Sequence, residues 1–436
     1  MSPQSSSPSF EPLFVPEPTS GPAAFGFAPC EGGVCAAAGV RAAGVSAGFR
    51  KNPKRLDLAL VVADETCAAA GTFTTNRFCA APVTVCREHV ADGRARAVVL
   101  NSGNANAATG EPGLANARTA CELVARTLGC EASDVLVAST GVIGVQLPFE
   151  PYVEGVPAAV VALGSDAAHA HDAACAVMTT DTHPKEAAIA GQVLAADGSR
   201  YEVHVGGFVK GSGMIMPQMA TMLCVLATDA PLTAEAARLA LRAAVGQTFN
   251  KVTVDSDTST NDSCFLLATG AAAPAGETIG PDSAAFPAVA AAVAGVCGEL
   301  ARQIAADGEG ASKLVTVDVM GAATDADADA VARAIANSPL VKTAIFGHDA
   351  NWGRVAGAAG KAGVPFDQYQ VQIDLMGVPV CRDGLAVPMD EDDMLRRFEA
   401  PEITIAVDLG QGACHTRVWT CDLTHDYVTI NGDYRT

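Results

Sequence analysis

The chain has 436 residues and a mass of 44.2 kDa, which is enough for two or three domains and a sizeable buried core. Its 48 Asp and Glu residues outnumber 28 Lys and Arg residues, and the resulting net charge of −20 argues against nucleic acid or an anionic membrane surface as a partner. Hydrophobic residues make up 49% of the chain and charged residues only 17%, a composition that excludes a disordered protein.

The start of the chain and its cysteines indicate the compartment. No Lys or Arg precedes Arg41, so the basic start of a secretory signal is missing, and the longest uncharged apolar stretch, Ala284–Gly298, is too short to span a bilayer. The 14 cysteines are scattered, mostly in apolar runs, as is typical of buried reduced thiols. Cys30 and Cys35 lie close together but lack a second pair at zinc-finger spacing, which leaves a disulfide or metal role there as the minor alternative. We expect a cytoplasmic protein without a metal.

In chain order, the first segment is residues 1–35, whose prolines and serines predict a mobile tail. From Arg41 onward, strand and helix patterns alternate, and a polar, Gly-containing segment at 195–200 predicts a hairpin. The predicted strands are Leu56–Ala63, Arg96–Leu100, Val135–Ser139, Met222–Thr228 and Cys264–Ala268. The predicted helices are Leu114–Leu128, most of Val156–Met178, and Ala234–Val245 with Thr233 as its N-cap. This alternation predicts an α/β fold, and the order of the strands stays open.

The segment KGSGMIMPQMATML, residues 210–223, contains a Thr with two interpretations. Thr221 comes directly before a predicted strand, and the spacing alone favours an ordinary β-branched strand residue. The alternative is a nucleophile, whose hydroxyl needs an adjacent base, and the α-amine of the same Thr can be that base. This alternative requires cleavage of the bond between Ala220 and Thr221.

Three further polar segments each allow more than one interpretation. In STGVIG, residues 139–144, a hydroxyl and a Gly N–H at a strand end either form a plain turn or donate to an oxyanion. In NSGNAN, residues 101–106, the amides either cap a turn or orient a polar substrate. DSDTSTND, residues 255–262, lacks the Gly and Glu of a calcium loop, so we expect a hydrogen-bonded turn that supports a site. The glycine loops of the usual nucleotide sites are missing from the sequence.

Taken together, these segments closely resemble one family, the ornithine acetyltransferases, also called bifunctional glutamate N-acetyltransferases of arginine biosynthesis. The resemblance spans roughly Arg41 to Thr436. Its carriers are RAAGVSAG (41–48), NSGNANA (101–107), STGVIG (139–144), TTDTHPK (179–185), KGSGMIMPQMATML (210–223), DSDTSTND (255–262), DGEGASK (307–313), KTAIFGHDANWGR (342–354) and NGDYRT (431–436). Two departures are Ala350, where the family usually has Pro before NWGR, and the extra Pro-rich head.

The resemblance implies that the precursor cleaves itself between Ala220 and Thr221. An alpha chain, residues 36–220, and a beta chain, residues 221–436, would stay together in one αββα-layered, amino-terminal-nucleophile-like fold, and two of each would form a heterotetramer. Thr221 would be the nucleophile, and Thr140 and Gly141 would form the oxyanion hole. The implied substrate contacts are Thr179 or the neighbouring Thr182, Lys210, Thr221, Glu309, Asn431 and Thr436.

The implied reaction is a ping-pong transfer of the acetyl group from N2-acetyl-ornithine to glutamate, without a cofactor or metal. Acetyl-CoA is a second donor in bifunctional members, and the sequence does not decide whether this chain uses it. Lys210 and Glu309 are suitable residue types for the carboxylate and the ammonium group of an amino acid. Two alternatives stay open: an amino-terminal-nucleophile aminopeptidase or amidase of related fold, which passes the acyl group to water, and a binding protein that stays uncleaved.

Overall fold

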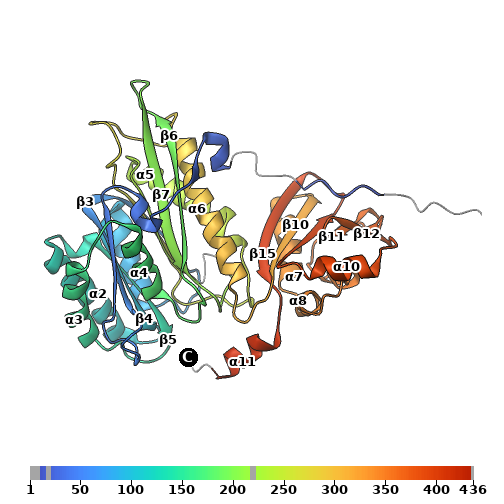
Figure 1. Ribbon diagram of the computed structural model, residues 1–436, viewed down its shortest axis with the longest axis horizontal. Coiled ribbons are helices and arrows are strands. Elements are labelled where there is room, and N and C mark those ends of the chain that lie inside the picture. Colours follow the sequence, from blue (N-terminus) through green and yellow to red (C-terminus); the bar gives the residue numbers. More distant parts are fainter. Residues whose placement is uncertain (1–9, 16–20, 217–221, 434–436) are drawn as a thin grey trace, which may run out of the picture. The chain divides into compact units, whose positions relative to one another are not determined.

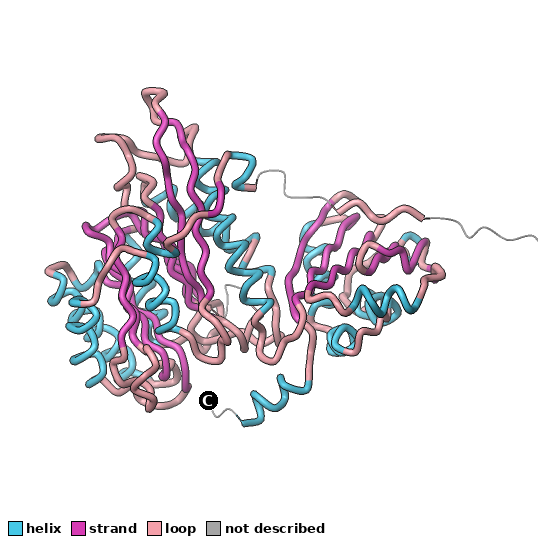
Figure 2. The backbone as a smooth tube through the Cα atoms, viewed as in Figure 1, coloured by secondary structure: helices cyan, strands magenta, loops and turns pink. Residues whose placement is uncertain are grey.

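The structure is a computed structural model that describes residues 10–15, 21–216 and 222–433. These residues form two compact units, a larger one of residues 21–309 and 430–433 and a smaller one of residues 10–15 and 310–429. Each unit combines a β-sheet with helices (Figure 1), and their succession can be followed along the backbone (Figure 2). The predicted α/β class is therefore confirmed.

The sheet of the larger unit has the strand order β1-β6-β7-β8-β9-β3-β4-β5 among the described residues, and β2 pairs with β3 outside this path. Its strands are β1 (Ala28–Pro29), β2 (Val40–Val45), β3 (Leu58–Phe73), β4 (Arg94–Asn104), β5 (Val135–Val142), β6 (Lys185–Leu194), β7 (Arg200–Lys210), β8 (Leu223–Thr228) and β9 (Ser263–Ala268). The register pairs Lys210 with Leu223, and Leu223 with Ser263. The end of β7 and the starts of β8 and β9 therefore share one edge of the sheet.

Strand β3 belongs to two groups of strands. Its first part pairs with β2 and β4, whereas residues 68–73 pair with β9, and the register to β4 shifts between Val62 and Cys67. Such an irregularity bends a strand and increases its twist. One hydrophobic cluster contains residues from both groups, among them Leu60 of β3 and Phe208 of β7. The two strand groups therefore share a core, as the predicted layered arrangement requires.

Helices cover both strand groups of the larger unit (Figure 1). They are α1 (Ala81–His89), α2 (Gly110–Leu128), α3 (Glu150–Val161), α4 (Ala167–Val177), α5 (Ala234–Gln247) and α6 (Phe286–Ala306). The first four helices contact β2, β3 or β5, and α5 and α6 contact β3, β6 or β7. Thr233 caps α5 as predicted, because its side chain accepts a hydrogen bond from the Ala236 N–H.

The helix predicted for most of Val156–Met178 is interrupted, and this is a correction. The segment belongs to two helices, α3 and α4, because Asp166 starts a new helix by accepting hydrogen bonds from the N–H groups of Ala168 and His169. Just before this cap, Gly164 forms a β-bridge with Ala42. An Ala-rich composition favours helix but does not show where a helix stops.

The last part of the Pro-rich segment is packed against the larger unit. Ala28 and Pro29 form β1 and pair with β6, and the side chains of Phe27 and Val34 are buried. The Phe27 ring lies so close to Gly191 of β6 that a Cβ built there would come within 2.6 Å of it. Residues 21–35, which we expected to belong to a mobile tail, thus contribute strand and core contacts.

Helix α6 is long and unusually apolar. Its 21 residues have a mean hydropathy of 1.3, so by length and composition alone it could cross a membrane. Half of its most apolar 18-residue stretch is buried inside the protein, where the helix packs against α5, β6 and β7. A core helix has these same properties, and Pro287 lies in its first turn, where proline is tolerated.

The smaller unit has a sheet of order β13-β12-β11-β14-β10-β15 among its described residues. Its strands are β10 (Leu314–Ala322), β11 (Gln372–Leu375), β12 (Val378–Arg382), β13 (Leu385–Ala386), β14 (Glu402–Asp408) and β15 (Cys414–Cys421). Its helices are α7 (Asp325–Ala336), α8 (Pro339–Phe346), α9 (Trp352–Gly360) and α10 (Glu391–Phe398), followed by α11 (His425–Asp433), whose last residues belong to the larger unit. A separate hydrophobic cluster, which includes Val317, Ile335 and Ile405, forms its core.

Candidate active site

A pocket with several polar and charged residues in its lining lies in the larger unit, where β5 and β7 end. It encloses about 640 Å³, including the space at its open mouth. Its lining residues come from widely separated parts of the sequence and are Ala105, Thr140, Gly141, Ile143, Thr179, Thr180, Lys210, Gly213, Met214, Ser259, Asn261, Glu309 and Asn431. Six of the predicted site residues, those numbered 140, 141, 179, 210, 309 and 431, therefore share one cavity.

Lys210 is a buried cation at this pocket. It is the last residue of β7, and its Nζ donates a hydrogen bond of 3.4 Å to the Thr140 Oγ1. Burial lowers the pKa of Lys210 below its usual value, while the carboxylate of Asp181 acts in the opposite direction. A charged amine in this position suits an anionic group of a small ligand.

Thr140 and Gly141 lie within β5 rather than in the turn that we expected after Ser139. The strand continues because Thr140 and Gly141 pair in parallel with the end of β4. Gly141 has a φ of +130°, and a side chain there would collide with the backbone of Gly103 and Asn104. A glycine is therefore required where these two strand ends approach each other.

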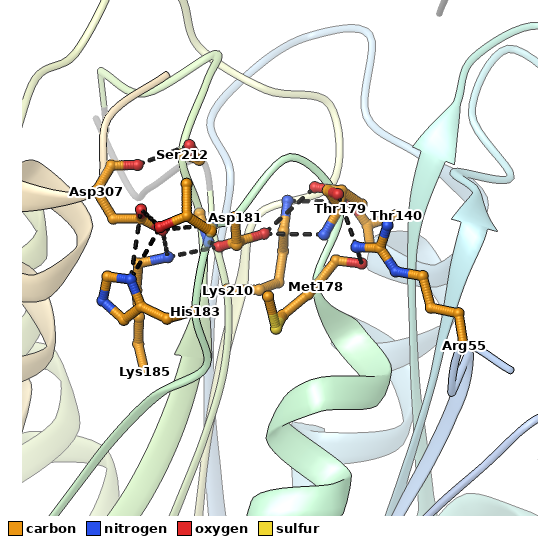
Figure 3. A network of polar contacts seen from close by, with 12 residues as sticks. Arg55, Thr140, Met178, Thr179, Asp181, His183, Lys185, Lys210, Ser212 and Asp307 are labelled. Carbon is orange, nitrogen blue, oxygen red and sulfur yellow. Dashed lines mark hydrogen bonds and ion pairs between the residues drawn. The ribbon is translucent and has the colours of Figure 1, made fainter. Parts of the chain in front are cut away.

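The two alternatives for the predicted substrate contact, Thr179 and Thr182, lie in different surroundings, and Thr179 can be seen in Figure 3. Thr179 lines the pocket, and its N–H donates to the Asp181 Oδ2 over 2.9 Å. The Thr182 hydroxyl instead donates to the Asp307 carboxylate. Thr182 is not among the lining residues, and the geometry favours Thr179 together with its neighbour Thr180.

Glu309 and Asn431 complete the pocket from the end of the larger unit's sequence. The Asn431 Nδ2 donates to the Glu309 Oε2 over 2.8 Å, so the amide orients the carboxylate. The Glu309 N–H donates to the carbonyl of Ser212 over 2.9 Å, and the Ser212 hydroxyl donates to the carbonyl of Asp307. The segments around 212 and 309 thus hold each other in place.

Asp255 confirms the expected supporting turn in DSDTSTND. Its carboxylate accepts hydrogen bonds from the N–H groups of Met214 (2.5 Å) and Ile215 (2.8 Å), and it thereby fixes part of the pocket wall. Burial raises the pKa of Asp255, although these N–H donors oppose the shift. Across residues 10–15, 21–216 and 222–433, there is no cluster of three or more His, Cys, Asp or Glu residues suited to a metal ion.

The side-chain amides of NSGNAN donate hydrogen bonds to backbone carbonyl groups. Asn101 donates to the carbonyl of Asn104 over 3.0 Å, and Asn104 donates to the carbonyl of Val145 over 3.1 Å. The Asn106 amide likewise donates to the carbonyl of Gly113. Of the two interpretations, capping and bracing of turns therefore describes these three side chains, and only Ala105 of this segment lines the pocket.

Sequence reasoning did not select the buried ions beside the pocket. Lys185 is fully buried, and its Nζ contacts the Asp181 Oδ1 at 2.7 Å and the Asp307 Oδ2 at 2.5 Å (Figure 3). Asp181 and Lys185 are both in the motif TTDTHPK. Their spacing of four residues was the feature of the sequence that could have indicated an ion pair. Arg55 was also missed, and it donates to the carbonyl of Thr179 over 2.9 Å.

Three predicted site residues, Ala220, Thr221 and Thr436, lie outside the described residues. The nearest described residue after the proposed cleavage point is Met222, whose carbonyl accepts a hydrogen bond from the Ser263 N–H. The proposed roles of Thr221 therefore stay predictions.

Comparisons with known proteins cover most of the chain. The model of the ArgJ family matches residues 41–436. The arginine biosynthesis bifunctional protein of Nitratidesulfovibrio vulgaris is 48% identical over 400 residues, which are 91% of this chain and 98% of that protein. The protein of the same name from Symbiobacterium thermophilum is also 48% identical, over 93% of this chain and 99% of that protein. The chain belongs to the ArgJ family.

Two solved structures are also similar to this family member. The crystal structure of the arginine biosynthesis bifunctional protein from Bacillus halodurans is 39% identical, with a TM-score of 0.46, over 49% of this chain and 98% of that one. The ornithine acetyltransferase of Mycobacterium tuberculosis, complexed with ornithine, is 40% identical, with a TM-score of 0.40, over 44% of this chain and 98% of that one.

Proposed function

We propose that this member of the ArgJ family is a self-cleaving acetyltransferase of arginine biosynthesis, which moves an acetyl group from N2-acetyl-ornithine to glutamate. Its curated relatives are named arginine biosynthesis bifunctional proteins. The observation that carries the proposal is the pocket, in which a cation, a carboxylate and a candidate oxyanion hole lie together. Because the relatives are named for biosynthesis, the alternative of a hydrolase is not favoured.

Both substrates are amino acids with an α-carboxylate, and the pocket has charges to match. Lys210 is suited to a carboxylate, and Glu309, held by Asn431, is suited to a side-chain ammonium group such as that of ornithine. Thr179 adds a hydroxyl at the wall. This arrangement supports small amino-acid substrates rather than a polymer.

In the proposed reaction, the hydroxyl of Thr221 attacks the acetyl carbonyl and passes its proton to the α-amine of the same residue. The hydroxyl of Thr140 and the N–H of Gly141 stabilise the oxyanion. The amide C–N bond then breaks, and ornithine leaves with the proton. The amine of glutamate attacks the acetyl-Thr221 ester and restores the free hydroxyl. The cycle needs no cofactor or metal, and acetyl-CoA is proposed as a second donor to glutamate.

The proposal includes processing and assembly. Cleavage between Ala220 and Thr221 would give an alpha chain ending at residue 220 and a beta chain ending at residue 436, each about half of 44.2 kDa. We propose that two copies of each chain form a heterotetramer and that the enzyme works in the cytoplasm. A denaturing gel tests the cleavage, and light scattering of the native protein tests the assembly.

The decisive experiment is the intact mass after brief exposure to N2-acetyl-ornithine without glutamate. An acetyl increment is expected on the fragment that begins at Thr221, and it should disappear when glutamate is added. An increment on the other fragment, or on any Cys or Ser, would contradict the mechanism. Loss of the increment at the same rate with and without glutamate would instead support the hydrolase.

A further inference from the structure

Asp181 occupies a central position among the buried charges beside the pocket, and the pocket does not include it. Figure 3 shows it between Lys185 and Lys210. Its Oδ1 accepts hydrogen bonds of 2.7 Å from both the Lys185 Nζ and the Gly211 N–H, and its Oδ2 accepts from the N–H and hydroxyl of Thr179. One carboxylate thus joins two segments that line the pocket, one around residue 179 and the other around residue 210.

We propose that Asp181 is a positioning residue of the proposed transferase site: it holds Thr179 and the Lys210–Gly211 segment in place and supplies the negative charge that keeps the buried Lys210 cationic. This inference rests on the proposed function, because the cation matters only if it binds the substrate's carboxylate. The role proposed for Asp181 is to position these groups, not to make or break bonds.

The charges around Lys210 support this role. Four titratable groups have the largest effect on the pKa of Lys210. The carboxyl groups of Asp181, Glu309 and Asp262 favour its charged form, and Lys185 disfavours it. Burial raises the pKa of Asp262 well above its usual value, so this group is a poor counter-ion. Glu309 faces the pocket and is the group suited to the substrate's ammonium. Asp181 is therefore the carboxylate whose charge acts most strongly on Lys210, and its hydrogen bond from the Gly211 N–H anchors it beside that residue.

Asp181 is itself suited to remain ionised. Burial raises its pKa, but the charges of Lys210 and Lys185, with hydrogen bonds from Lys185 and Thr179, outweigh burial and bring the pKa well below its usual value. An ionised carboxylate can accept from all of its donors at once, whereas an amide cannot, because its NH2 group only donates. Asp181→Asn therefore removes the charge and misplaces one acceptor with little change in shape.

The test measures the KM for N2-acetyl-ornithine against pH in the full chain. For Asp181→Asn we expect KM to rise about 10- to 100-fold, the same scale as the loss of a residue that orients a metal ligand. Because Asp181 raises the pKa of Lys210, its loss lowers that pKa further, and Lys210 loses its proton at a lower pH. The rise of KM with pH should therefore begin at lower pH than in the wild type, with a smaller effect on kcat.

Asp307→Asn is the matched control. Asp307 is similarly buried and also contacts Lys185, yet it is not among the groups with the largest effect on the pKa of Lys210. It should lower thermal stability as much as Asp181→Asn while leaving the pH profile of KM in place. The same shift in both variants, or no shift in Asp181→Asn, would overturn the proposal and identify the cluster as structural.

A second variant keeps the test decisive if Asp181→Asn does not fold. Asp181→Asn combined with Lys185→Met and Asp307→Asn removes all three charges of the buried cluster, so KM should stay raised through the loss of the Thr179 and Gly211 hydrogen bonds, with a smaller shift of the pH profile. A KM equal to that of the wild type would overturn the proposal. Wild-type protein that transfers no acetyl group would contradict the proposed function itself, which these outcomes distinguish from a failure of Asp181 alone.

Discussion

In the larger unit Lys185 lies between Asp181 and Asp307, and in the smaller unit Arg382 lies against Asp374, with 2.6 Å between the Arg382 Nη1 and the Asp374 Oδ1. All five side chains are buried. Removing one partner of such a pair is costly in either place, because it leaves an uncompensated charge inside the protein. Burial of ions is therefore common to both units and does not identify a site.

The two clusters differ in what their remaining hydrogen bonds reach. In the smaller unit, Asp374 accepts from the N–H of Leu13 over 2.6 Å, and Arg382 donates to the carbonyl of Glu11 over 2.9 Å, so the cluster fixes the described start of the chain. In the larger unit, Asp181 reaches the pocket-lining Thr179. The role of a buried ion therefore depends on the residues that it contacts.

The largest expected effect is at the proposed nucleophile. Thr221→Ala should give an intact chain of 44.2 kDa without transferase activity, because cleavage and acyl transfer both need the hydroxyl. Thr221→Ser is the matched control and should retain part of both reactions, because a primary hydroxyl can also attack. A denaturing gel and an acetyl-transfer assay measure the outcome. Efficient cleavage in Thr221→Ala would contradict the role of Thr221 as the nucleophile of cleavage.

In the smaller unit, Arg382→Met should lower the free energy of unfolding by about 3–5 kcal/mol, since Asp374 is left buried without its cation. Both tryptophans, Trp352 and Trp419, are in this unit, so their fluorescence during urea unfolding reports on it directly. The double variant with Asp374→Asn should recover part of the loss. The kcat of the folded protein should not change, and a fall would contradict a purely structural role for this cluster.

Thr140→Ala should leave a folded, cleaved protein whose acyl transfer is slower by about 10²–10³-fold, the scale for one lost oxyanion donor. This loss should be in kcat, because the donor acts on charge that develops only in the transition state. Thr127→Ala is a suitable control, since its hydroxyl donates to the carbonyl of Leu123 on the exposed side of α2. Single-turnover kinetics distinguish this result from impaired binding, which would appear in KM.

The smallest effect is expected at the cap of α4. Asp166→Ala should lower the stability slightly, because the N–H groups of Ala168 and His169 lose their acceptor. Hydrogen exchange at these two amides should accelerate, and Asp166→Asn should retain most of the protection. Unchanged exchange in Asp166→Ala would mean that the cap does not account for the break between α3 and α4.

Local sequence patterns were sufficient to predict several strands, one helix start and the family of this protein. Hydrophobic runs predicted the strands in β3, β4, β8 and β9, and Thr233 predicted the start of α5, because these features depend on neighbouring residues alone. The resemblance carried by motifs such as STGVIG and DGEGASK indicated the family, which the comparison over residues 41–436 confirms. It also selected six residues that the structure brings into one pocket.

Long-range contacts decided where some strands and helices end and which side chains face the pocket. Thr140 and Gly141 continue β5 because the end of β4 offers them partners, and Gly164 interrupts the Ala-rich helical stretch through its bridge to Ala42. Thr179 faces the pocket while Thr182 contacts Asp307, 125 residues further along the chain. The pKa of Asp181 likewise depends on burial, which raises it, and on the charges of Lys185 and Lys210, which lower it. A sequence pattern does not contain the distances that decide which of these effects is larger.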